Sequence, residues 1–190
     1  MRTIRTTRLR LVPVTAANAA LLWRVLQEPD LRKYQDLPDV NREQFARVVG
    51  GRPTRFAPGS VGRFEWLVHY LPAGDEPLGW VSLRVADANR ATAEIGYSVV
   101  RAHRGLGIAS EAVAALIDEG FIRARLREIH AYCLPENLSS RAVLRRNGFK
   151  DAGTLTRGAT VQGKPVDVIA HSLDRERWAG LSENPQATRS

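Results

Sequence analysis

The feature that most constrains the fold is a glycine-containing turn between a β-rich segment and an amphipathic helix. Residues 93–100 (AEIGYSVV) have the composition of a strand, and from residue 110 onward apolar side chains recur at helical spacing. At such a junction, exposed backbone N–H groups and the helix dipole create an anion site that glycines leave open to phosphate. The sequence therefore predicts either a phosphate-binding loop or a plain strand-to-helix turn, made of Arg104, Gly105, Leu106, Gly107, Ile108 and Ala109.

Two common nucleotide-binding loops can be tested against the spacing of these glycines. A Walker loop requires a lysine after its last glycine, and no lysine follows Gly105 or Gly107. A dinucleotide-binding fingerprint requires a third glycine three positions after Gly107, where the chain has Ser110. The spacing excludes both loops. Arg101 and His103 add positive charge to the same turn, which still favours a diphosphate ligand.

The rest of the chain alternates strand-like and helix-like segments, which predicts one mixed α/β domain. Short connections between neighbouring strand segments favour antiparallel pairing. The domain should occupy residues 1–180, followed by a frayed tail at 181–190. We expect strands at 7–14, 64–70, 78–85, 93–100, 129–134, 152–157 and 166–173, and helices at 16–27, at 42–49, from 110 onward and within 135–148.

The charge of the chain favours a polyanionic partner. The formal net charge is +8, and arginine supplies most of it because Lys33, Lys150 and Lys164 are the only lysines. Planar guanidinium groups suit phosphate, so nucleic acid and a phosphorylated cofactor are both candidates. A basic surface that only aids solubility has the same composition.

The single cysteine and the apolar pattern predict a soluble, cytoplasmic protein. Cys133 has no partner for an intramolecular disulfide or a multi-cysteine metal site. It shares a strand face with Ile129 and Ala131, which favours a core position over a nucleophilic role. The four histidines lack metal-ligand spacing, so we expect no metal. The sequence has neither a signal-peptide-like apolar stretch nor a membrane-length apolar window.

The turn and its neighbours resemble the GNAT acetyltransferase superfamily. Arg104-x-x-Gly107-x-Ala109 is similar to the family's Gln/Arg-x-x-Gly-x-Gly/Ala pyrophosphate loop, and residues 93–100 look like its fourth strand. Residues 137–149 (NLSSRAVLRRNGF) resemble the next helix of a branch that includes bacterial ribosomal-protein N-terminal acetyltransferases and several antibiotic acetyltransferases. The opening TRLRLVPVT and the closing GKPVDVIAHSL are also similar to that branch, so the likeness covers residues 7–178.

The resemblance implies a fold and a cofactor site. The GNAT fold is a mixed, mostly antiparallel sheet of six or seven strands flanked by about four helices, and it binds acetyl-CoA where its fourth and fifth strands splay apart. Backbone groups of the fourth strand would bind the pantetheine arm as an added strand would, and the glycine loop would bind the diphosphate. The implied cofactor-binding residues are Ser98, Val99, Arg104, Gly105, Leu106, Gly107, Ile108, Ala109 and Asn137, of which Asn137 also suits the start of a helix.

The resemblance also implies the chemistry. A neutral amine attacks the thioester directly, which requires a proton acceptor for the amine and a proton donor for the leaving thiolate. Glu94 matches the candidate base of this branch, acting directly or through water, and is otherwise a solvated or salt-bridged strand residue. Many family members place a tyrosine acid where this chain has Leu144. Ser140 matches a serine that faces the thioester sulfur in similar ribosomal-protein acetyltransferases, and a helix N-cap would account for it equally.

The acceptor amine is predicted only by class. The chain-wide resemblance favours a protein N-terminus such as that of a ribosomal protein, and the alternative is a small-molecule amine: an aminoglycoside, a polyamine or an amino acid. We expect the segments 28–60 and 155–166 to select the acceptor. A non-catalytic acyl-CoA-binding module would need neither Glu94 nor Ser140. A nucleic-acid partner is disfavoured because the arginines are dispersed. Both a monomer and a homodimer remain open.

Overall fold

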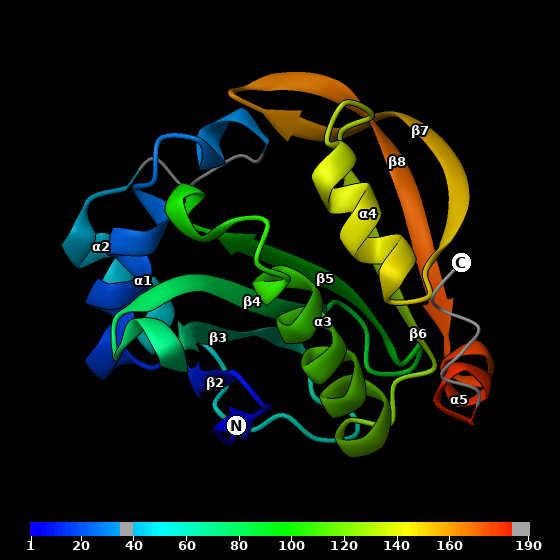
Figure 1. The fold of residues 1–190 in the computed structure, drawn as a ribbon, viewed down its shortest axis with the longest axis horizontal. Coiled ribbons are helices and arrows are strands. Elements are labelled where there is room, and N and C mark those ends of the chain that lie inside the picture. Colours follow the sequence, from blue (N-terminus) through cyan, green and yellow to red (C-terminus); the bar gives the residue numbers. More distant parts are fainter. Residues whose placement is uncertain (35–39, 184–190) are drawn as a thin grey trace.

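Alternating apolar side chains in the first half of the chain form a run of antiparallel strands. The second half adds helices and the further strands that extend this sheet. The computed structural model describes residues 1–34 and 40–183 (Figure 1). Its sheet has the strand order β1-β2-β3-β4-β5-β6-β8-β7. The strands are β1 (Ile4–Arg5), β2 (Leu9–Pro13), β3 (Gly62–Tyr70), β4 (Pro77–Val85), β5 (Thr92–Val99), β6 (Glu128–Cys133), β7 (Lys150–Val161) and β8 (Lys164–Asp174).

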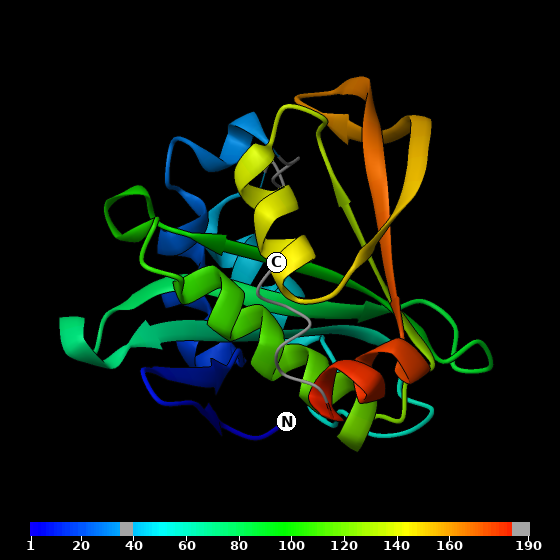
Figure 2. The same cartoon turned by 45° about the vertical axis from the view of Figure 1, so that its right-hand side comes forward.

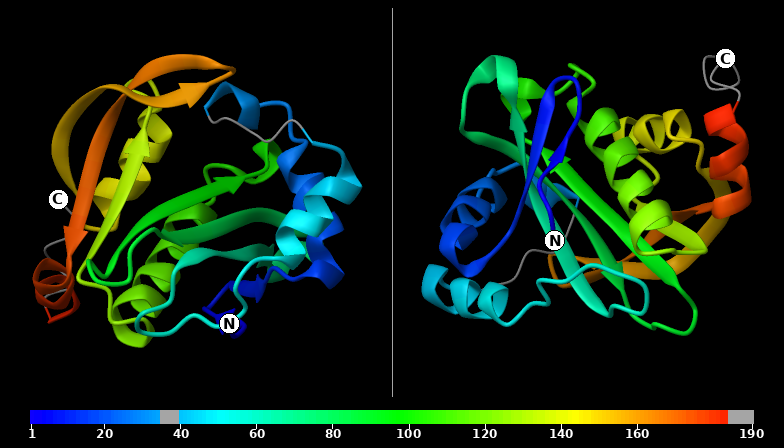
Figure 3. Two further views of the ribbon diagram at one scale, coloured as in Figure 1. Left: turned by 180° about the vertical axis from the view of Figure 1, so that it is seen from behind. Right: turned by 90° about the horizontal axis from the view of Figure 1, so that it is seen from below.

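The sheet is mixed, because β5 and β6 run parallel while the other neighbours are antiparallel. Only residues 92–94 of β5 pair with β6, opposite residues 128–130. Beyond these residues the two strands diverge, as the left view of Figure 3 shows. The predicted splay is therefore confirmed, and its strands become the fifth and sixth because the two-residue β1 precedes the predicted first strand.

Helices cover both faces of the sheet. The described part contains α1 (Ala19–Leu26), α2 (Arg42–Gly50), α3 (Ile108–Asp118), α4 (Leu138–Arg146) and α5 (Arg175–Glu183). Leu22 of α1 and Phe45 of α2 pack with Leu67 and Trp80 on one face, whereas Leu116 of α3 packs in a larger cluster on the other. Figure 2 shows α3 and α4 in front of the sheet. None of the helices in residues 1–34 and 40–183 is long and apolar enough to cross a membrane.

The fold class is as predicted, but the numbers of strands and helices were too low. The described residues form eight strands and five α-helices instead of six or seven strands and four helices. β1 has two residues, too short for an alternating pattern. The helix α5 begins directly after β8, where Asp174 Oδ1 accepts a hydrogen bond from Arg177 N at 2.7 Å. This helix continues to Glu183, so the tail expected from 181 starts inside it, and residues 184–190 lie outside the described residues.

The hairpin of β7 and β8 projects over the splay. Gln162 and Gly163 connect the two strands with φ angles of 51° and 73°, which is the backbone of a tight hairpin turn. In Figures 1 and 3 the tip of this hairpin approaches the short 3-10 turn Leu31–Lys33 that follows α1. The hairpin tip and the turn after α1 therefore border the same cavity, which Leu31, Thr160 and Val161 all line.

Candidate active site

A cavity of about 920 Å³ opens where β5 and β6 diverge. This volume is near the upper end of the usual range for small-molecule sites. Its walls come from β5, β6, the turn before α3, the start of α4 and the tip of the β7–β8 hairpin. Leu31 and Tyr34 line it as well, and residues 35–39 of the segment expected to select the acceptor lie outside the described residues.

The glycine turn forms one end of the cavity. Gly105 and Gly107 both have positive φ angles, 81° and 77°, which side chains other than glycine rarely adopt. Because Gly107 is the N-cap of α3 and has no side chain to cap it, the first N–H groups of the helix have no acceptor within the helix. Gly105, Gly107, Ile108 and Ala109 line the cavity. The turn therefore presents free backbone donors at the positive end of a helix dipole, which suits an anion.

Two predicted cofactor residues in the turn make contacts that the sequence did not suggest. Leu106 is absent from the cavity wall, its side chain is 47% exposed, and its carbonyl accepts a hydrogen bond from Arg8. Arg104 lines the cavity, but its Nε donates to Val99 O at 2.9 Å and its Nη1 lies 3.0 Å from Asp30 Oδ2. Arg104 therefore joins the end of β5 to the segment after α1.

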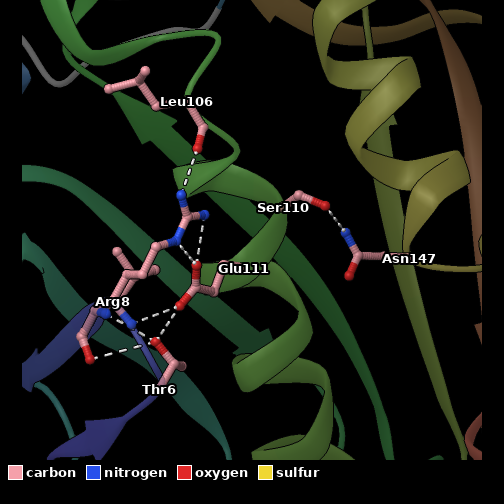
Figure 4. Close-up of polar contacts among 7 residues, drawn as sticks. Thr6, Arg8, Leu106, Ser110, Glu111 and Asn147 are labelled. Carbon is pink, nitrogen blue, oxygen red and sulfur yellow. Dashed lines mark hydrogen bonds and ion pairs between the residues drawn. The ribbon is translucent and has the colours of Figure 1, made fainter.

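Arg8 connects the N-terminal strands to the glycine turn (Figure 4). Its Nη1 donates to Leu106 O at 3.0 Å, and its Nη2 lies 2.7 Å from Glu111 Oε2 on α3. Thr6 Oγ1 and the Arg8 backbone N–H donate to the other oxygen of Glu111 at 2.5 and 3.1 Å. Burial alone would raise the pKa of Glu111, but these hydrogen bonds hold it below its ordinary value. The network fixes the turn from the side opposite the cavity.

Ser140 and Tyr97 meet at the middle of the cavity. The Asn137 side chain caps α4 by accepting a hydrogen bond from Ser140 N at 3.1 Å, so Ser140 is not the cap residue that the sequence also allowed. The Ser140 hydroxyl instead lies 2.8 Å from the Tyr97 hydroxyl. Burial raises the pKa of Tyr97 well above its ordinary value, although the Ser140 hydrogen bond opposes this. Tyr97 is thus a neutral donor at neutral pH.

The sequence interpretation missed Tyr97 as a site residue. It considered only the position where many family members have a tyrosine acid, which here is Leu144. The structure buries Leu144 completely. The available signal was strand alternation, because Tyr97 follows Glu94 by three residues and must face the opposite side of β5. That side is where α4 brings Ser140.

Glu94 lines the cavity and forms an ion pair at the same time. Its Oε2 accepts a hydrogen bond from Arg84 Nη2 on the neighbouring strand at 2.6 Å. The side chain is 38% exposed, so water and ligands can reach the carboxylate. The salt-bridged strand position is therefore present, whereas the role of Glu94 as a base stays a prediction.

Along the cavity β5 stays paired with β4, but its other edge has no pairing with β6 beyond Glu94. Ser98 and Val99 line the wall beyond the last pairing with β6, and the Val99 carbonyl is already bound by Arg104. Gly96 keeps a regular register with Ser82, so it marks no bulge. A Cβ at Gly96 would lie 3.3 Å from the Trp80 ring, which shows that glycine allows the close approach of that ring.

Cys133 lies in the core, as predicted, and it also lines the cavity from β6. Burial raises the pKa of its thiol, and the nearby Arg141 and Ser140 only partly oppose this. Such a thiol is protonated at neutral pH and is a weak nucleophile. Within the part of the chain that the structure describes, no three histidine, cysteine, aspartate or glutamate residues gather as a metal site would require.

A family model described as an acetyltransferase (GNAT) domain matches residues 8–150. The chain belongs to the GNAT acetyltransferase family. It is an acetyl-CoA-dependent N-acyltransferase, as the family description and the names of its relatives indicate. The uncharacterized N-acetyltransferase p20 of Bacillus licheniformis is 32% identical over 181 residues, 95% of this chain and 100% of that protein. The ribosomal-protein-serine acetyltransferase of Escherichia coli is 38% identical over 81 residues, 43% of this chain and 45% of that enzyme.

Solved structures share this GNAT fold. The ribosomal L7/L12 α-N-protein acetyltransferase RimL, in complex with coenzyme A, superposes with a TM-score of 0.79 at 23% identity, covering 91% of this chain and 98% of RimL. RimJ of Mycobacterium smegmatis, in complex with CoA-disulfide, gives 0.75 at 24% identity over 98% and 91% of the two chains. The predicted membership of the GNAT family is confirmed, and ribosomal-protein acetyltransferases are among the proteins that the chain resembles.

Proposed function

We propose that this enzyme transfers the acetyl group of acetyl-CoA to the N-terminal amine of a protein, such as a ribosomal protein. The observation that carries the proposal is that one continuous cavity includes the free N–H groups of α3, Tyr97, Ser140 and Glu94. A thioester and an amine can meet within it. The names of the Escherichia coli relative and of RimL, with its similar fold over nearly the whole chain, support a protein acceptor.

The residues around the cavity fit acetyl-CoA, which supplies the activated acetyl group. The N–H groups at Gly105, Gly107, Ile108 and Ala109 would hold the diphosphate. A further sign of fit is the buried Nδ1 of His103, a cavity residue, which has no hydrogen-bond partner among the described residues. Ile108 and Ala109 supply their N–H groups from the first turn of α3, whereas Leu106 does not line the cavity and its carbonyl is bound by Arg8.

The pantetheine arm would lie along the open edge of β5. The backbone of Ser98 and Val99 borders this part of the cavity, where β6 no longer pairs with β5. Asn137 lies across from it, and because its Oδ1 caps α4, only its amide group is left to donate to a ligand.

Two pairs of side chains would move protons. The Glu94 carboxylate accepts the proton of the acceptor amine, directly or through water, and Arg84 fixes the orientation of the carboxylate. On the other face of β5, the Ser140 hydroxyl donates to the leaving thiolate and the Tyr97 hydroxyl hydrogen-bonds to Ser140. Base and acid therefore act from opposite faces of one strand.

Replacement of Glu94 tests the base. Glu94→Gln should lower kcat by roughly 10²–10⁴-fold, the usual span for general acid–base catalysis, and the loss should shrink at high pH because the amine then arrives neutral. The affinity for acetyl-CoA should hardly change. Asp87→Asn, which alters an exposed carboxylate paired with Arg90, is the matched control. A Glu94→Gln enzyme with unchanged kcat across the pH range would remove Glu94 from this role.

An acceptor panel tests the function itself. CoA release is measured with peptides that carry ribosomal-protein N-termini and, in parallel, with aminoglycosides, polyamines and free amino acids. Peptide turnover with a kcat/KM at least tenfold above every small amine is the expected result. A small amine as the best acceptor would contradict the proposal. Acetyl-CoA binding with no turnover of any amine would indicate the non-catalytic module instead.

A further inference from the structure

A row of three charged side chains crosses the acceptor end of the cavity. Arg63 on β3 lies directly opposite Arg84 on β4, and Arg84 lies directly opposite Glu94 on β5. All three line the cavity. Strand alternation places them on the face of the sheet that carries Trp80, the face covered by α1 and α2. We refer to Arg63, Arg84 and Glu94 as the acceptor row.

The charges of the acceptor row do not balance. Glu94 pairs with Arg84 at 2.6 Å, and Arg63 Nε donates to Glu65 Oε1 at 2.7 Å. Glu65 is itself buried and also pairs with Arg52. Among the described residues, the three guanidinium groups of Arg52, Arg63 and Arg84 thus share the two carboxylates of Glu65 and Glu94, which leaves one positive charge in excess.

The guanidinium of Arg63 lies over the Trp80 ring, 5.6 Å from its centroid, and opposite the like charge of Arg84, so an anion in the cavity would stabilise both arginines. Like charges directly opposite each other on neighbouring strands destabilise a sheet. Burial lowers the pKa of Arg63, Glu94 opposes this shift, and the charge of Arg84 adds to it. The side chain is still 41% exposed, and its Nε alone makes the bond to Glu65, so its terminal N–H groups can reach a ligand in the cavity. A guanidinium fork of this kind matches a carboxylate.

We propose that Arg63 and Arg84 bind a carboxylate of the acceptor, so that the preferred substrates are peptides with an acidic side chain next to their first residue. The inference rests on the proposed function and names its substrate class. Neighbouring strands lie ~4.8 Å apart, so Arg63 sits ~10 Å from Glu94 across the row. An extended peptide advances ~3.4 Å per residue, so an acidic side chain at the second or third position spans that distance from the amine. Polycationic acceptors such as aminoglycosides and polyamines are repelled.

The test compares three peptides that share a first residue and carry Glu, Gln or Lys at the second and third positions. The wild-type kcat/KM, followed by CoA release, should fall from Glu to Gln to Lys, with at least a tenfold difference between Glu and Lys. Arg63→Gln should reduce that ratio to about threefold or less while the Kd of acetyl-CoA stays unchanged. The change should appear in KM, and a general loss of structure would not produce such selectivity.

Two further variants keep the result interpretable. Arg63→Lys retains the charge without the planar fork and should keep part of the preference, which separates recognition from misfolding. Arg90→Gln removes an exposed arginine outside the cavity and should leave the ratio as in the wild type. Addition of salt should weaken the preference for the Glu peptide.

Failure of this inference differs from failure of the proposed function. Equal turnover of the Glu, Gln and Lys peptides, or an unchanged ratio in Arg63→Gln, would overturn the acidic preference and leave N-terminal acetylation intact. An aminoglycoside or polyamine that is a better acceptor than every peptide would overturn both.

Discussion

Gly107 is the residue on which the proposed cofactor site depends most. Its φ of 77° favours glycine, and an added Cβ would lie 3.3 Å from Arg8 Nη2. A side chain here therefore strains the turn, costing ~1–2 kcal/mol for the left-handed backbone, and disturbs the arginine that holds it. The turn lies at the end of the cavity where backbone N–H groups are free.

Gly107→Glu should abolish binding of acetyl-CoA, because a carboxylate would enter the proposed diphosphate site. Titration calorimetry measures the affinity, and Gly107→Ala should show a smaller loss. Gly59→Ala is the control for backbone strain alone, since Gly59 has a φ of 78°, open space around it and no place on the cavity wall. A folded Gly107→Glu protein with wild-type affinity would exclude this turn as the cofactor site.

Tyr97 and Ser140 are single residues whose role depends on each other. Tyr97→Phe and Ser140→Ala should each lower kcat by roughly 10²-fold, near the lower end of the span for acid catalysis. The loss should be greatest below the thiol pKa of about 8.5, where the leaving thiolate needs a proton. Because the two hydroxyls lie 2.8 Å apart and act together, the double variant should be little worse than the worse single variant.

Rates over the pH range, the Kd of acetyl-CoA and melting temperatures together decide this prediction. Ser140 is not the cap of α4, so its replacement should cost less stability than loss of a cap, ~1 kcal/mol. Strictly additive effects of the two substitutions would show that the hydroxyls work independently.

At the scale of elements, the N-terminal strands control the turn before α3. The amphipathic pattern predicted β2 and α3 separately, but only the structure shows that Arg8 joins them through Leu106 and Glu111 (Figure 4). The opening segment therefore supports the proposed cofactor site although it does not line the cavity.

Arg8→Gln should weaken acetyl-CoA binding about threefold to tenfold, a loss of roughly 0.7–1.4 kcal/mol, because the Leu106 carbonyl loses its partner and the turn loosens. Arg10→Gln is the matched control, since Arg10 lies two residues away and pairs with the exposed Asp75. Calorimetry and melting curves are compared for both variants. A lower melting temperature with unchanged affinity for acetyl-CoA would reduce Arg8 to a structural residue.

At the scale of the whole molecule, α5 packs against the segments that follow α3 and α4. Trp178 stacks on Phe121 with ring centroids 5.2 Å apart, and its Nε1 donates to Asp118 at 2.9 Å. Arg175 and Arg177 donate to the carbonyls of Leu126 and Gly148 at 3.0 and 2.6 Å. The last helix thus contacts the end of α3, the start of β6 and the turn after α4.

Trp178→Ala should lower the free energy of unfolding by ~2–3 kcal/mol through lost apolar burial, which corresponds to a fall of ~5–10 °C in melting temperature for a chain of this size. Gly180→Ala in the same helix should act in the opposite direction, because Gly180 has open space around it and alanine favours the helix by up to ~1 kcal/mol. Thermal melts check both. A Trp178→Ala protein as stable as the wild type would show that α5 is not coupled to the core.

The sequence by itself determined the local features of this protein. Glycine spacing and alternating apolar residues predicted the turn, the helix α3 and most strands, because these depend on backbone conformation and on neighbours a few residues away. The same motifs predicted the GNAT family, now shown by the match over residues 8–150. The sequence interpretation missed β1 and α5, which are short or polar. Contacts with residues distant in the sequence, such as Trp178 on Phe121, stabilise such elements.

Only the tertiary structure decided how the side chains of the site meet. The partners of Tyr97, Arg8 and Arg63 lie on elements 43, 103 and 21 residues away, Ser140, Glu111 and Arg84, and no local pattern specifies such pairs. The sheet brings them together because strand register and helix packing are set by burial of apolar faces across the whole chain. The sequence thus fixes the chemistry that is present, and the packing of the sheet decides which groups share one cavity.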